Sequence, residues 1–320
     1  MDQRTDLSGF AAKIEEIKQM ASTVVVGQQY AMELIIASIL AEGHVLLEGV
    51  PGVAKTLMAR TLSRLIDTRF GRIQFTPDLM PSDVLGTTVF NLQKSEFEFH
   101  PGPIFADIVL VDEINRAPAK TQAALFEVMQ ERQVTVDGKG YPMKPVFTVI
   151  ATQNPVEQEG TYKLPEAQLD RFIMKINVPY PSPADELEVL SRFNGNSAFN
   201  KLTDLRPVIT IEELYELRKT LTSVVIEPSL MEYIVKIVSR TRNHKLIYLG
   251  ASPRASMALM QTSKAIALLR GRDFVTPDDI QVVAIPVLQH RLILAMDAEL
   301  SGENMPNIIR SVIEEIEVPK

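Results

Sequence analysis

Short apolar runs alternate with helix-like spacing of apolar residues over the first half of the chain. The short strands predicted at 44–48 and 108–111 contain the apolar runs 45–47 and 108–111, and residues 55–66 between them have helical periodicity. Apolar strands that alternate with helices are typical of a parallel sheet covered on both faces. Further strands are predicted at 72–75, 146–151 and 172–178, and further helices at 10–20, 28–41 and 119–131.

The pattern changes at residues 179–183, where three prolines interrupt the chain and strand-like runs largely stop. The helices predicted after this point are 184–193, 211–221, 228–241, 253–270 and 277–290. The last of them opens with Thr276 and Pro277, a capping residue followed by proline at the first helical position. We therefore expect an α/β domain at 1–185 and a helical domain at 186–320.

Composition limits the classes of function. The 320 residues leave room for two domains. They contain no run of about eighteen apolar residues, so no membrane span is expected. The absence of cysteine excludes disulfides, thiol catalysis and cysteine zinc sites, and it fits a cytoplasmic location. The four histidines are far apart and form no metal-ligand pair, and a net charge of −7 argues against a broad nucleic-acid surface.

Residues 49–56 match the phosphate-loop pattern G-x-x-x-x-G-K-[ST], except that Ala54 takes the place of the second glycine. Backbone N–H groups of such a loop surround phosphates, and the following helix adds the positive end of its dipole. Lys55 supplies a charge for the outer phosphates, and the Thr56 hydroxyl binds Mg²⁺. The turn remains feasible if φ at Ala54 is negative. The alternative is an ordinary Gly/Pro turn, but strand, turn, Lys-Thr and helix occur in the order that a nucleotide site requires.

Two acids follow the apolar run at 108–111. Asp112, at the carboxyl end of a buried strand, is positioned to hold Mg²⁺ through water. Glu113 is then the base that orients and polarises the attacking water. Asn154 follows the next apolar strand, where it either donates to that water or to the γ-phosphate, or is a turn residue before Pro155.

Together these residues resemble the AAA+ ATPases, and more narrowly the MoxR family. The matching segments are 47–56, 74–83, 112–118, 151–155, 164–172 and 251–254, and they cover the chain from about Val24 to His290. A set of segments in this order is far more specific than a phosphate loop alone. Alanine is common in this family at the position of Ala54, so it is no departure from the family pattern.

The resemblance implies roles that spacing alone leaves open. Asn154 corresponds to the sensor-1 residue, Arg171 to an arginine finger that reaches the neighbouring subunit, and Arg254 to sensor 2, which contacts the γ-phosphate in its own subunit. Without the family, a salt bridge to Glu166 or Asp170 is the more ordinary explanation for Arg171, and electrostatic capping of a helix for Arg254. The candidate catalytic residues are Lys55, Glu113, Asn154, Arg171 and Arg254.

The resemblance also implies the nucleotide contacts and two inserts. Residues 76–104 correspond to the helix-2 insert. Residues 133–145 correspond to the hairpin before sensor 1, where Asp137 and Gly138 are themselves a strong hairpin signal. Arg116 is a further candidate for contact between subunits. The expected contacts with ATP or ADP are Val26, Gly27, Gly49, Val50, Pro51, Gly52, Val53, Ala54, Lys55, Thr56, Leu57 and Arg254, with Gln28 also in the adenine segment, and the expected Mg²⁺ ligands are Thr56 and Asp112.

The fold that the resemblance implies is α/β, a P-loop NTPase core of the AAA+ type with a parallel five-stranded sheet of order 5-1-4-3-2, followed by an all-α lid domain. Family members usually form hexameric rings. The implied function is hydrolysis of ATP to ADP and phosphate that drives chaperone-like remodelling or maturation of a client protein, such as insertion of a metal or cofactor. A partner with a von Willebrand factor A domain is implied by the resemblance only.

Three alternatives stay open. A nucleic-acid motor would use the helix-2 insert, but Lys139 and Lys144 are too few to outweigh the net acidity of the chain. A magnesium-chelatase-like motor subunit is the second alternative. The third is a nucleotide-gated scaffold with little turnover. The presence of four residues argues against it: Lys55, Asp112, Glu113 and Arg171.

Overall fold

The computed structural model describes residues 8–155, 161–194 and 201–319. Five strands form one parallel sheet in the order β2-β5-β8-β1-β9. Their bounds are β1 (His44–Glu48), β2 (Phe70–Gln74), β5 (Ile108–Asp112), β8 (Thr148–Gln153) and β9 (Phe172–Asn177). Numbered among themselves along the chain, these strands have the order 5-1-4-3-2 from β9 to β2, which confirms the predicted topology.

The strands are apolar on both faces because both faces are covered. Along β5, Ile108 and Leu110 pack into one hydrophobic cluster, whereas Val109 and Val111 pack into another. The first cluster includes the buried faces of α1 (Ser8–Val24), α2 (Gln29–Leu40) and α3 (Lys55–Leu65). The second cluster, on the opposite face of β5, includes the buried residues of α5 (Ala119–Glu131). The two-sided burial explains the continuous apolar runs in the sequence.

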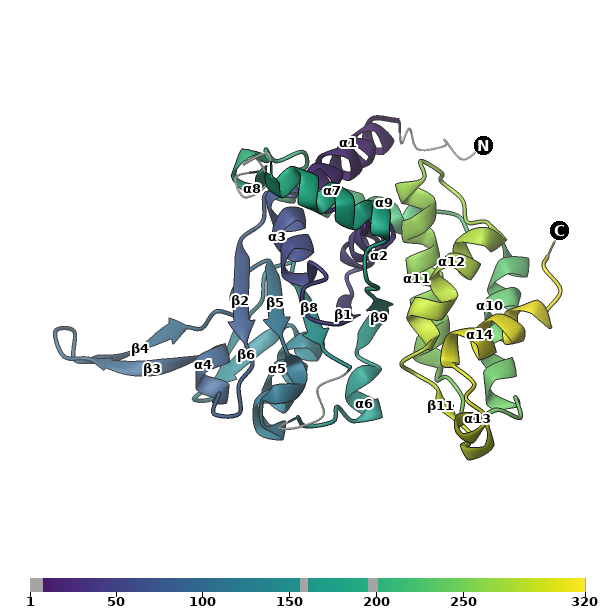
Figure 1. Cartoon of the computed structure of the whole chain (residues 1–320). Helices are drawn as coiled ribbons and strands as arrows, with labels where there is room; N and C mark the ends of the chain where they lie inside the picture. The colour runs from purple at the N-terminus through teal and green to yellow at the C-terminus, as the bar shows by residue number, and fades with distance from the viewer. Residues whose placement is uncertain (1–7, 156–160, 195–200, 320) are drawn as a thin grey trace.

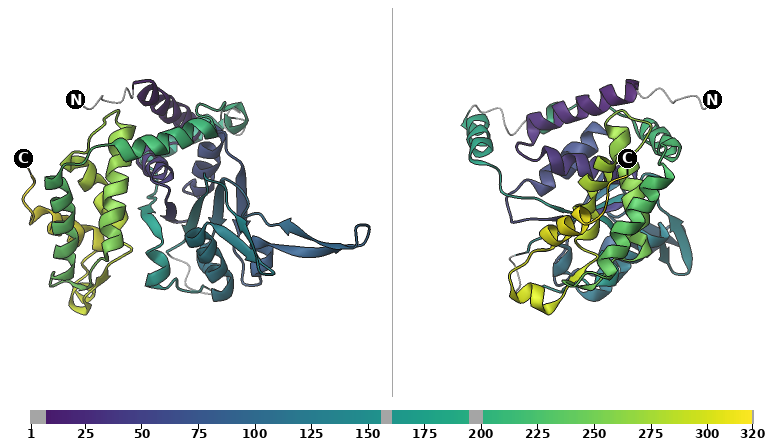
Figure 2. Two further views of the ribbon diagram at one scale, coloured as in Figure 1. Left: turned by 180° about the vertical axis from the view of Figure 1, so that it is seen from behind. Right: turned by 90° about the vertical axis from the view of Figure 1, so that its right-hand side faces the viewer.

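A group of helices lies beside the edge strand β9 (Figures 1 and 2). It consists of α9 (Ile211–Ser223), α10 (Pro228–Arg242), α11 (Pro253–Leu269), α12 (Pro277–Leu288), α13 (Met296–Leu300) and α14 (Met305–Glu314), with the short pair β10 (Ile247–Leu249) and β11 (Ile293–Leu294). The end of α12 is joined to β9, because the Gln289 side chain donates to the carbonyl of Lys175 at 2.6 Å. This group is the helical C-terminal part that the sequence predicts, although α13, α14 and the short strand pair were not predicted.

The α12 start follows its sequence signal. Thr276 is the residue before the helix, and its backbone N–H donates to the Asp279 carboxylate at 2.8 Å. Arg272 also pairs with Asp279 at 2.6 Å, so the first turn of α12 is fixed by a buried acid.

Two hairpins stand outside the central sheet. The pair β6 (Gln133–Val136) and β7 (Lys139–Pro142) is the hairpin predicted at Asp137-Gly138, and both turn residues have positive φ, 50° and 76°. The other pair, β3 (Gly86–Asn91) and β4 (Glu96–Pro101), follows the short helix α4 (Pro81–Leu85) and projects away from the body of the molecule (Figure 1). It lies within the predicted insert at 76–104, but the sequence pattern did not show that the insert is a hairpin.

The connection between the α/β and helical parts runs through α7 (Pro183–Asn194) and α8 (Lys201–Asp204). The predicted boundary between residues 185 and 186 falls in the first turn of α7 and stays a prediction. Short helical turns also occur at η1 (Ile114–Arg116) and α6 (Glu166–Leu169). Among the helices of the described ranges, none combines the length and apolar character needed to cross a membrane.

Candidate functional site

The carboxyl ends of three neighbouring strands bring the sequence-predicted residues to one edge of the sheet. The strands β5, β8 and β1 are adjacent and parallel, and Glu48 at the end of β1 is paired with Gln153 at the end of β8. Asn154 follows Gln153 directly and is 7% exposed. In open α/β sheets, ligands bind outside the carboxyl ends of the strands. The carboxyl edge is therefore the candidate site.

Lys55 is the first residue of α3, and its side chain turns back onto the carboxyl edge. The Lys55 Nζ donates to the carbonyls of Gly49 and Gln153, the second at 3.4 Å. Gly49 admits no side chain, because a Cβ there would lie 2.5 Å from the carbonyl oxygen of Val178. Gly52 has φ of 87° and open space where a Cβ would be, so this part of the loop leaves room for a ligand. Loop and lysine together form a cradle suited to phosphate oxygens.

Ala54 departs from the expectation made for it. Its φ is 64° and its ψ is 21°, a left-handed conformation, so the condition of a negative φ is not met although the turn forms. The loop makes its last turn here, directly before the first residue of α3, and that turn requires the left-handed region. Such a conformation costs an L-residue roughly 1–2 kcal/mol. Alanine has only a methyl side chain, so it can adopt this conformation at a small cost. The loop therefore keeps the turn that a glycine would make.

Asp112 and Glu113 end β5 and point to different partners. The Asp112 carboxylate accepts from Arg72 Nε at 2.7 Å and from the Thr152 hydroxyl at 3.3 Å. The backbone N–H of Glu113 donates to the same hydroxyl at 3.0 Å, and Glu113 itself has a left-handed φ of 58°. Strained backbone of this kind occurs often at functional positions. The Asp112 carboxylate is thus held between β2 and β8.

The Glu113 carboxylate is held by two side chains that the sequence analysis did not connect with it. Gln74 Nε2 donates to Glu113 Oε2 at 3.0 Å, and Arg116 Nε lies 3.1 Å from the same oxygen. Gln74 is paired in register with Asp112, one residue before Glu113. The signal that could have identified Gln74 is the strand order itself, because only adjacency of β2 and β5 brings it there.

A cavity of about 660 Å³ opens beside the loop. Its walls come from the segment before α2, the loop, the start of α3, and α7 with the residues around it. The lining residues are Val24, Val25, Val26, Gln28, Gly52, Val53, Ala54, Leu57, Arg60, Pro181, Glu186, Val189, Leu190, Arg192, Leu202 and Thr203. Val26 and Gln28 of the predicted adenine segment are among them, and Gly27, with φ of 72°, packs against Asp185 at the start of α7. The largely apolar wall suits a flat heterocycle with phosphates directed at the loop.

The residues at this edge also fit a magnesium ion that arrives with a nucleotide. In the described ranges, His, Asp and Glu form no group of three or more able to hold a metal ion. Mg²⁺ at phosphoryl-transfer sites is bound by one or two protein oxygens, by water and by the phosphates themselves. The Thr56 hydroxyl and the Asp112 carboxylate are hard oxygen donors of that kind. The donor chemistry therefore matches a metal held partly by its nucleotide.

Arg171 and Arg254 lie outside that cavity, around Asp170. Arg171 Nη1 donates to the carbonyl of Phe126 at 2.5 Å, with the guanidinium 6.0 Å from the Phe126 ring. Arg254, just inside α11, lies 3.7 Å from the Asp170 carboxylate and is 56% exposed. The buried Arg291 holds the other Asp170 oxygen at 2.7 Å. The structure thus places Arg254 beside the Asp170 carboxylate and Arg171 against Phe126, and neither arginine is among the residues that line the cavity.

The opposite, amino edge of the sheet carries a different set of charges. Arg218, 4% exposed, donates to the carbonyls of Ile39 at 2.7 Å and Pro145 at 2.8 Å, and burial lowers its pKa to about 10. His44 is fully buried, with Nε2 3.1 Å from the carbonyl of Met129, and burial lowers its pKa to about 4. Perturbed groups often mark functional sites. Here their partners are main-chain atoms, as expected of structural residues.

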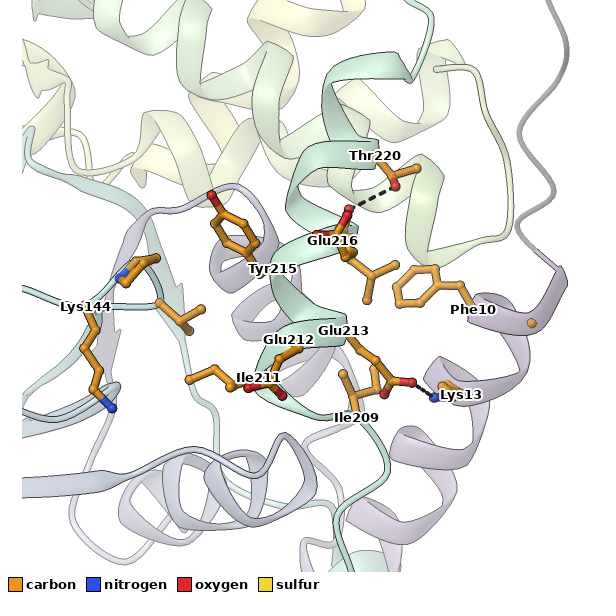
Figure 3. Close-up of a pocket in the computed structure, with 14 residues that line it drawn as sticks. Phe10, Lys13, Lys144, Ile209, Ile211, Glu212, Glu213, Tyr215, Glu216 and Thr220 are labelled. Atoms are coloured by element: carbon orange, nitrogen blue, oxygen red, sulfur yellow. Dashed lines mark hydrogen bonds and ion pairs between the residues drawn. The ribbon is translucent and has the colours of Figure 1, made fainter.

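A larger cavity, of about 870 Å³, also lies toward this amino edge (Figure 3). It is formed by the start of α1, residues 144–146 and the first half of α9, and its walls are mostly apolar. Lys13 and Glu213 form an ion pair at its rim. The residues that the sequence predicts as catalytic or as nucleotide contacts are not among those lining it, so size alone would direct attention to the wrong edge for the predicted chemistry.

Comparisons with known proteins agree with this geometry. A family described as "ATPase family associated with various cellular activities (AAA)" matches residues 44–174, and an "AAA lid domain" matches residues 239–312. Chaperone MoxR1 of Mycobacterium tuberculosis is 42% identical over 98% of this chain and 85% of its own length. The Bacillus subtilis protein YeaC is 49% identical over 92% of each chain. The crystal structure of a candidate ATPase from Cytophaga hutchinsonii superposes with a TM-score of 0.90 at 44% identity, covering 98% of this chain and 97% of that one.

Proposed function

The chain belongs to the MoxR family of AAA+ ATPases, and from this premise we propose that it binds ATP with Mg²⁺ and hydrolyses it to ADP and phosphate. The observation that carries the proposal is the position of the Lys55 amino group. It lies between the ends of β1 and β8, at the edge where β5 ends in two acids. A cation, a loop with free space and carboxylates at one sheet edge are the elements of phosphoryl transfer.

In the proposed reaction, the loop amides and Lys55 bind the phosphates, while Thr56 and Asp112 hold Mg²⁺. The ion, when bound, would neutralise charge on the phosphate oxygens. Asn154 would orient the attacking water from the end of β8. The adenine would occupy the apolar cavity next to Val26. Each of these roles is a proposal that the positions support.

Glu113 would act as the base after exchanging its partners. In the structure its carboxylate is engaged by Gln74 and Arg116, so it would have to leave one or both before it can accept a proton from water. Catalytic hydrogen bonds often form only when the substrate is present, so this geometry is compatible with the role. Gln74 would then keep the base inactive until the nucleotide is in position.

Turnover would depend on assembly into a ring, which we propose to be a hexamer. Arg171 would complete the site of the neighbouring subunit, and Arg254 would contact the γ-phosphate in its own subunit. A planar guanidinium suits the charge that spreads over the equatorial oxygens in the transition state. In the structure Arg171 is bonded to Phe126, so it would have to turn outward to act in this way.

The work done with this energy is proposed to be chaperone-like remodelling or maturation of a client protein, including metal or cofactor insertion. The β3–β4 hairpin supports a protein client, because Phe97 is 72% exposed and Leu92 is 84% exposed at a projecting position. Phe90 packs edge-on against Phe97, with ring centroids 5.1 Å apart. Exposed apolar groups of this kind mark interaction surfaces. A von Willebrand factor A partner, the domain boundary at residue 185 and the cytoplasmic location remain proposals that rest on the sequence.

The test is direct binding of ATP with Mg²⁺ by calorimetry, followed by steady-state phosphate release. The expected result is saturable binding that Lys55→Ala abolishes, with the variant still folded by circular dichroism. Lys175→Ala is a suitable control, because that lysine is paired with Glu48 on the edge strand. A folded wild-type protein that takes up no adenine nucleotide would refute the proposal. A pull-down with Glu113→Gln held in ATP would then identify the client.

A further inference from the structure

Asp170 contacts Arg254, an arginine of proposed catalytic role, and it belongs to the turn that carries Arg171. It lies directly after α6, and the turn is closed by hydrogen bonds from the Asp170 N–H to the Glu166 carbonyl at 3.1 Å and from the Arg171 N–H to the Gln168 carbonyl at 3.2 Å. Whatever fixes Asp170 therefore also restricts the backbone from which Arg171 extends.

The two oxygens of Asp170 have contacts of different strength. Oδ1 accepts from Arg291 Nε at 2.7 Å, and Arg291 is 4% exposed and also donates to the Phe172 carbonyl at 2.6 Å. Oδ2 faces Arg254 at 3.7 Å and the Ser252 hydroxyl at 3.5 Å, at the start of α11. A buried, short contact is durable, whereas an ion pair with an exposed arginine is weak. One oxygen is thus an anchor and the other an exchangeable contact.

The neighbouring charges favour this exchange. Burial lowers the pKa of Arg291, the hydrogen bond with Asp170 opposes that effect, and the nearby Arg254 guanidinium lowers the pKa further. The two guanidiniums therefore repel each other across a single carboxylate. A polyphosphate carries more negative charge than one carboxylate, so it would compete well for the exposed arginine.

Within the described part of the chain, the guanidinium of Arg171 does not have hydrogen-bond partners for all of its buried donors. Its Nη1 donates to the Phe126 carbonyl at 2.5 Å, but its Nε is buried and has no hydrogen-bond partner among the described residues. An unsatisfied buried donor is unfavourable, which favours release once the surrounding turn is free to move. The inward position therefore depends on restraint from outside the side chain.

We propose that Asp170 is the positioning residue that couples the two arginines: it holds Arg254 until the outer phosphate of ATP takes that arginine over, and the turn, still anchored through Arg291 but no longer through Arg254, then lets Arg171 leave Phe126 for the neighbouring site. This inference rests on the proposed function, because it assumes that Arg254 meets the γ-phosphate and that Arg171 acts between subunits. Its consequence is that each subunit supplies its arginine only after it has bound ATP.

The first test is a comparison of two affinities in Asp170→Asn. Binding of a non-hydrolysable ATP analogue with Mg²⁺ should tighten by up to about fivefold, the value of one exposed ion pair, because Arg254 is freed. ADP affinity should not change, since ADP has no γ-phosphate. Ser252→Ala is the matched control, because it removes a neutral contact to the same oxygen and should leave both affinities unchanged. Equal changes for both nucleotides, or none for the analogue, would overturn the proposal.

The second test measures the signal to the neighbour in mixed rings. Lys55→Ala subunits have an empty site, so they should keep Arg171 inward and leave the adjacent wild-type subunit slow. In equimolar mixtures, turnover per wild-type subunit should be roughly twofold higher when the Lys55→Ala subunits also carry Asp170→Asn, because half of the wild-type sites face such a neighbour. When the Lys55→Ala subunits carry Arg254→Ala in place of Asp170→Asn, turnover should rise by the same factor, because this change also removes the ion pair between Asp170 and Arg254.

The two hypotheses fail in different ways. Wild-type rings without ATP turnover would refute the proposed function itself. Active wild-type rings whose three mixtures give superimposable curves would refute only the coupling through Asp170. Ring content is checked by size-exclusion chromatography with light scattering, and folding by thermal melting, so loss of Asp170→Asn to misfolding still leaves Arg254→Ala as a decisive variant.

Discussion

Charged side chains have different kinds of partners at the two edges of the central sheet, where the strands have their carboxyl ends and their amino ends. At the carboxyl edge, the Glu113 carboxylate is held by the side chains of Gln74 and Arg116, and the contacts of Lys55 are only part-buried. The backbone there is strained at Ala54 and Glu113. At the amino edge, Arg218 and His44 are buried and bound to main-chain atoms that belong to the fold. Both edges hold polar groups that burial makes costly, but the Glu113 carboxylate at the carboxyl edge has side-chain partners that can rotate away.

This difference shows that shifted pKa values and large cavities do not identify a functional site unless the strand order is also considered. The lowered pKa values of Arg218 and His44, and the 870 Å³ cavity, all belong to the amino edge. Strand order instead directs attention to the carboxyl edge, because parallel strands align their ends there. The comparison leads to separate expectations: changes at the carboxyl edge should affect turnover, and changes at the amino edge should affect stability.

The largest expected effect concerns Arg171. Arg171→Ala should lower turnover in assembled rings by roughly 10³–10⁵, or about 4–7 kcal/mol of barrier. Mixing it with Glu113→Gln should partly restore turnover, because some interfaces then combine an intact base with an intact arginine. Phosphate release by rings of verified size is the measurement. Full activity of the variant in an assembled ring would show that Arg171 has no role in the reaction at the carboxyl edge of the neighbouring subunit.

Glu113→Gln tests the base at the carboxyl edge. Turnover should fall by roughly 10²–10⁴, because the general base is lost, while ATP binding is kept within about threefold. Glu131→Gln, an exposed acid at the end of α5, is the control and should leave turnover unchanged. Unchanged hydrolysis in Glu113→Gln would show that another group prepares the water.

Arg218→Met tests the amino edge. The free energy of unfolding should fall by roughly 2–4 kcal/mol, because the carbonyls of Ile39 and Pro145 lose their buried donor. Turnover per folded molecule should not change. Urea unfolding and phosphate release give the two values, and Lys219→Met, at the exposed next position of α9, should stay within about 0.5 kcal/mol of wild type. A large loss of turnover at unchanged stability would contradict the expectation that the amino edge affects stability and the carboxyl edge affects turnover.

The buried histidine predicts a pH dependence of stability. Folded His44 gains its proton near pH 4, whereas the unfolded chain gains it near the ordinary pKa of 6.5. Between these values the unfolded state binds more protons, so the free energy of unfolding should fall as pH falls, by about 1 kcal/mol per pH unit. Urea unfolding at pH 7, 6 and 5 measures the slope. His44→Gln should reduce it, and His100→Gln, at an exposed position, should not.

The smallest effect is expected at Ala54. Ala54→Gly relieves left-handed strain but adds freedom to the unfolded chain, so we expect a net gain in stability of at most about 1 kcal/mol. Ala59→Gly, the same change inside α3, should instead destabilise the protein. Thermal unfolding of both variants gives the comparison. Stability changes of opposite sign in the two variants would show that the effect arises from the backbone conformation at residue 54.

Local patterns in the sequence were sufficient for the sheet and for the loop. The apolar runs at β1 and β5 arise because both faces are covered, and the helix after the loop is visible from its spacing. The short strands of β3–β4 were missed because exposed strands lack a continuous apolar run. The last helix, α14, was missed as well, although Ile308 and Ile309 are buried.

Partners that depend on distant segments could not be predicted. Gln74 meets Glu113 only because β2 and β5 are neighbours, and Arg218 meets Ile39 across 179 positions of sequence. The loop holds Ala54 at a positive φ, whereas residue preference favours the negative φ that the sequence-based prediction sets as the condition for the turn. Sequence spacing identifies which side chains have suitable chemistry, and topology decides which of them meet.

The construction of the nucleotide-sized cavity has a kinetic consequence. Part of its wall is α7, whose Val189 and Leu190 line the space while Arg192 donates to the carbonyl of Thr23 at 2.7 Å, at the end of α1. Because α7 is also part of the covalent link to the helical group, a shift of that link moves one wall of the cavity. We therefore expect the position of this connecting helix to affect the rate at which a spent ligand leaves.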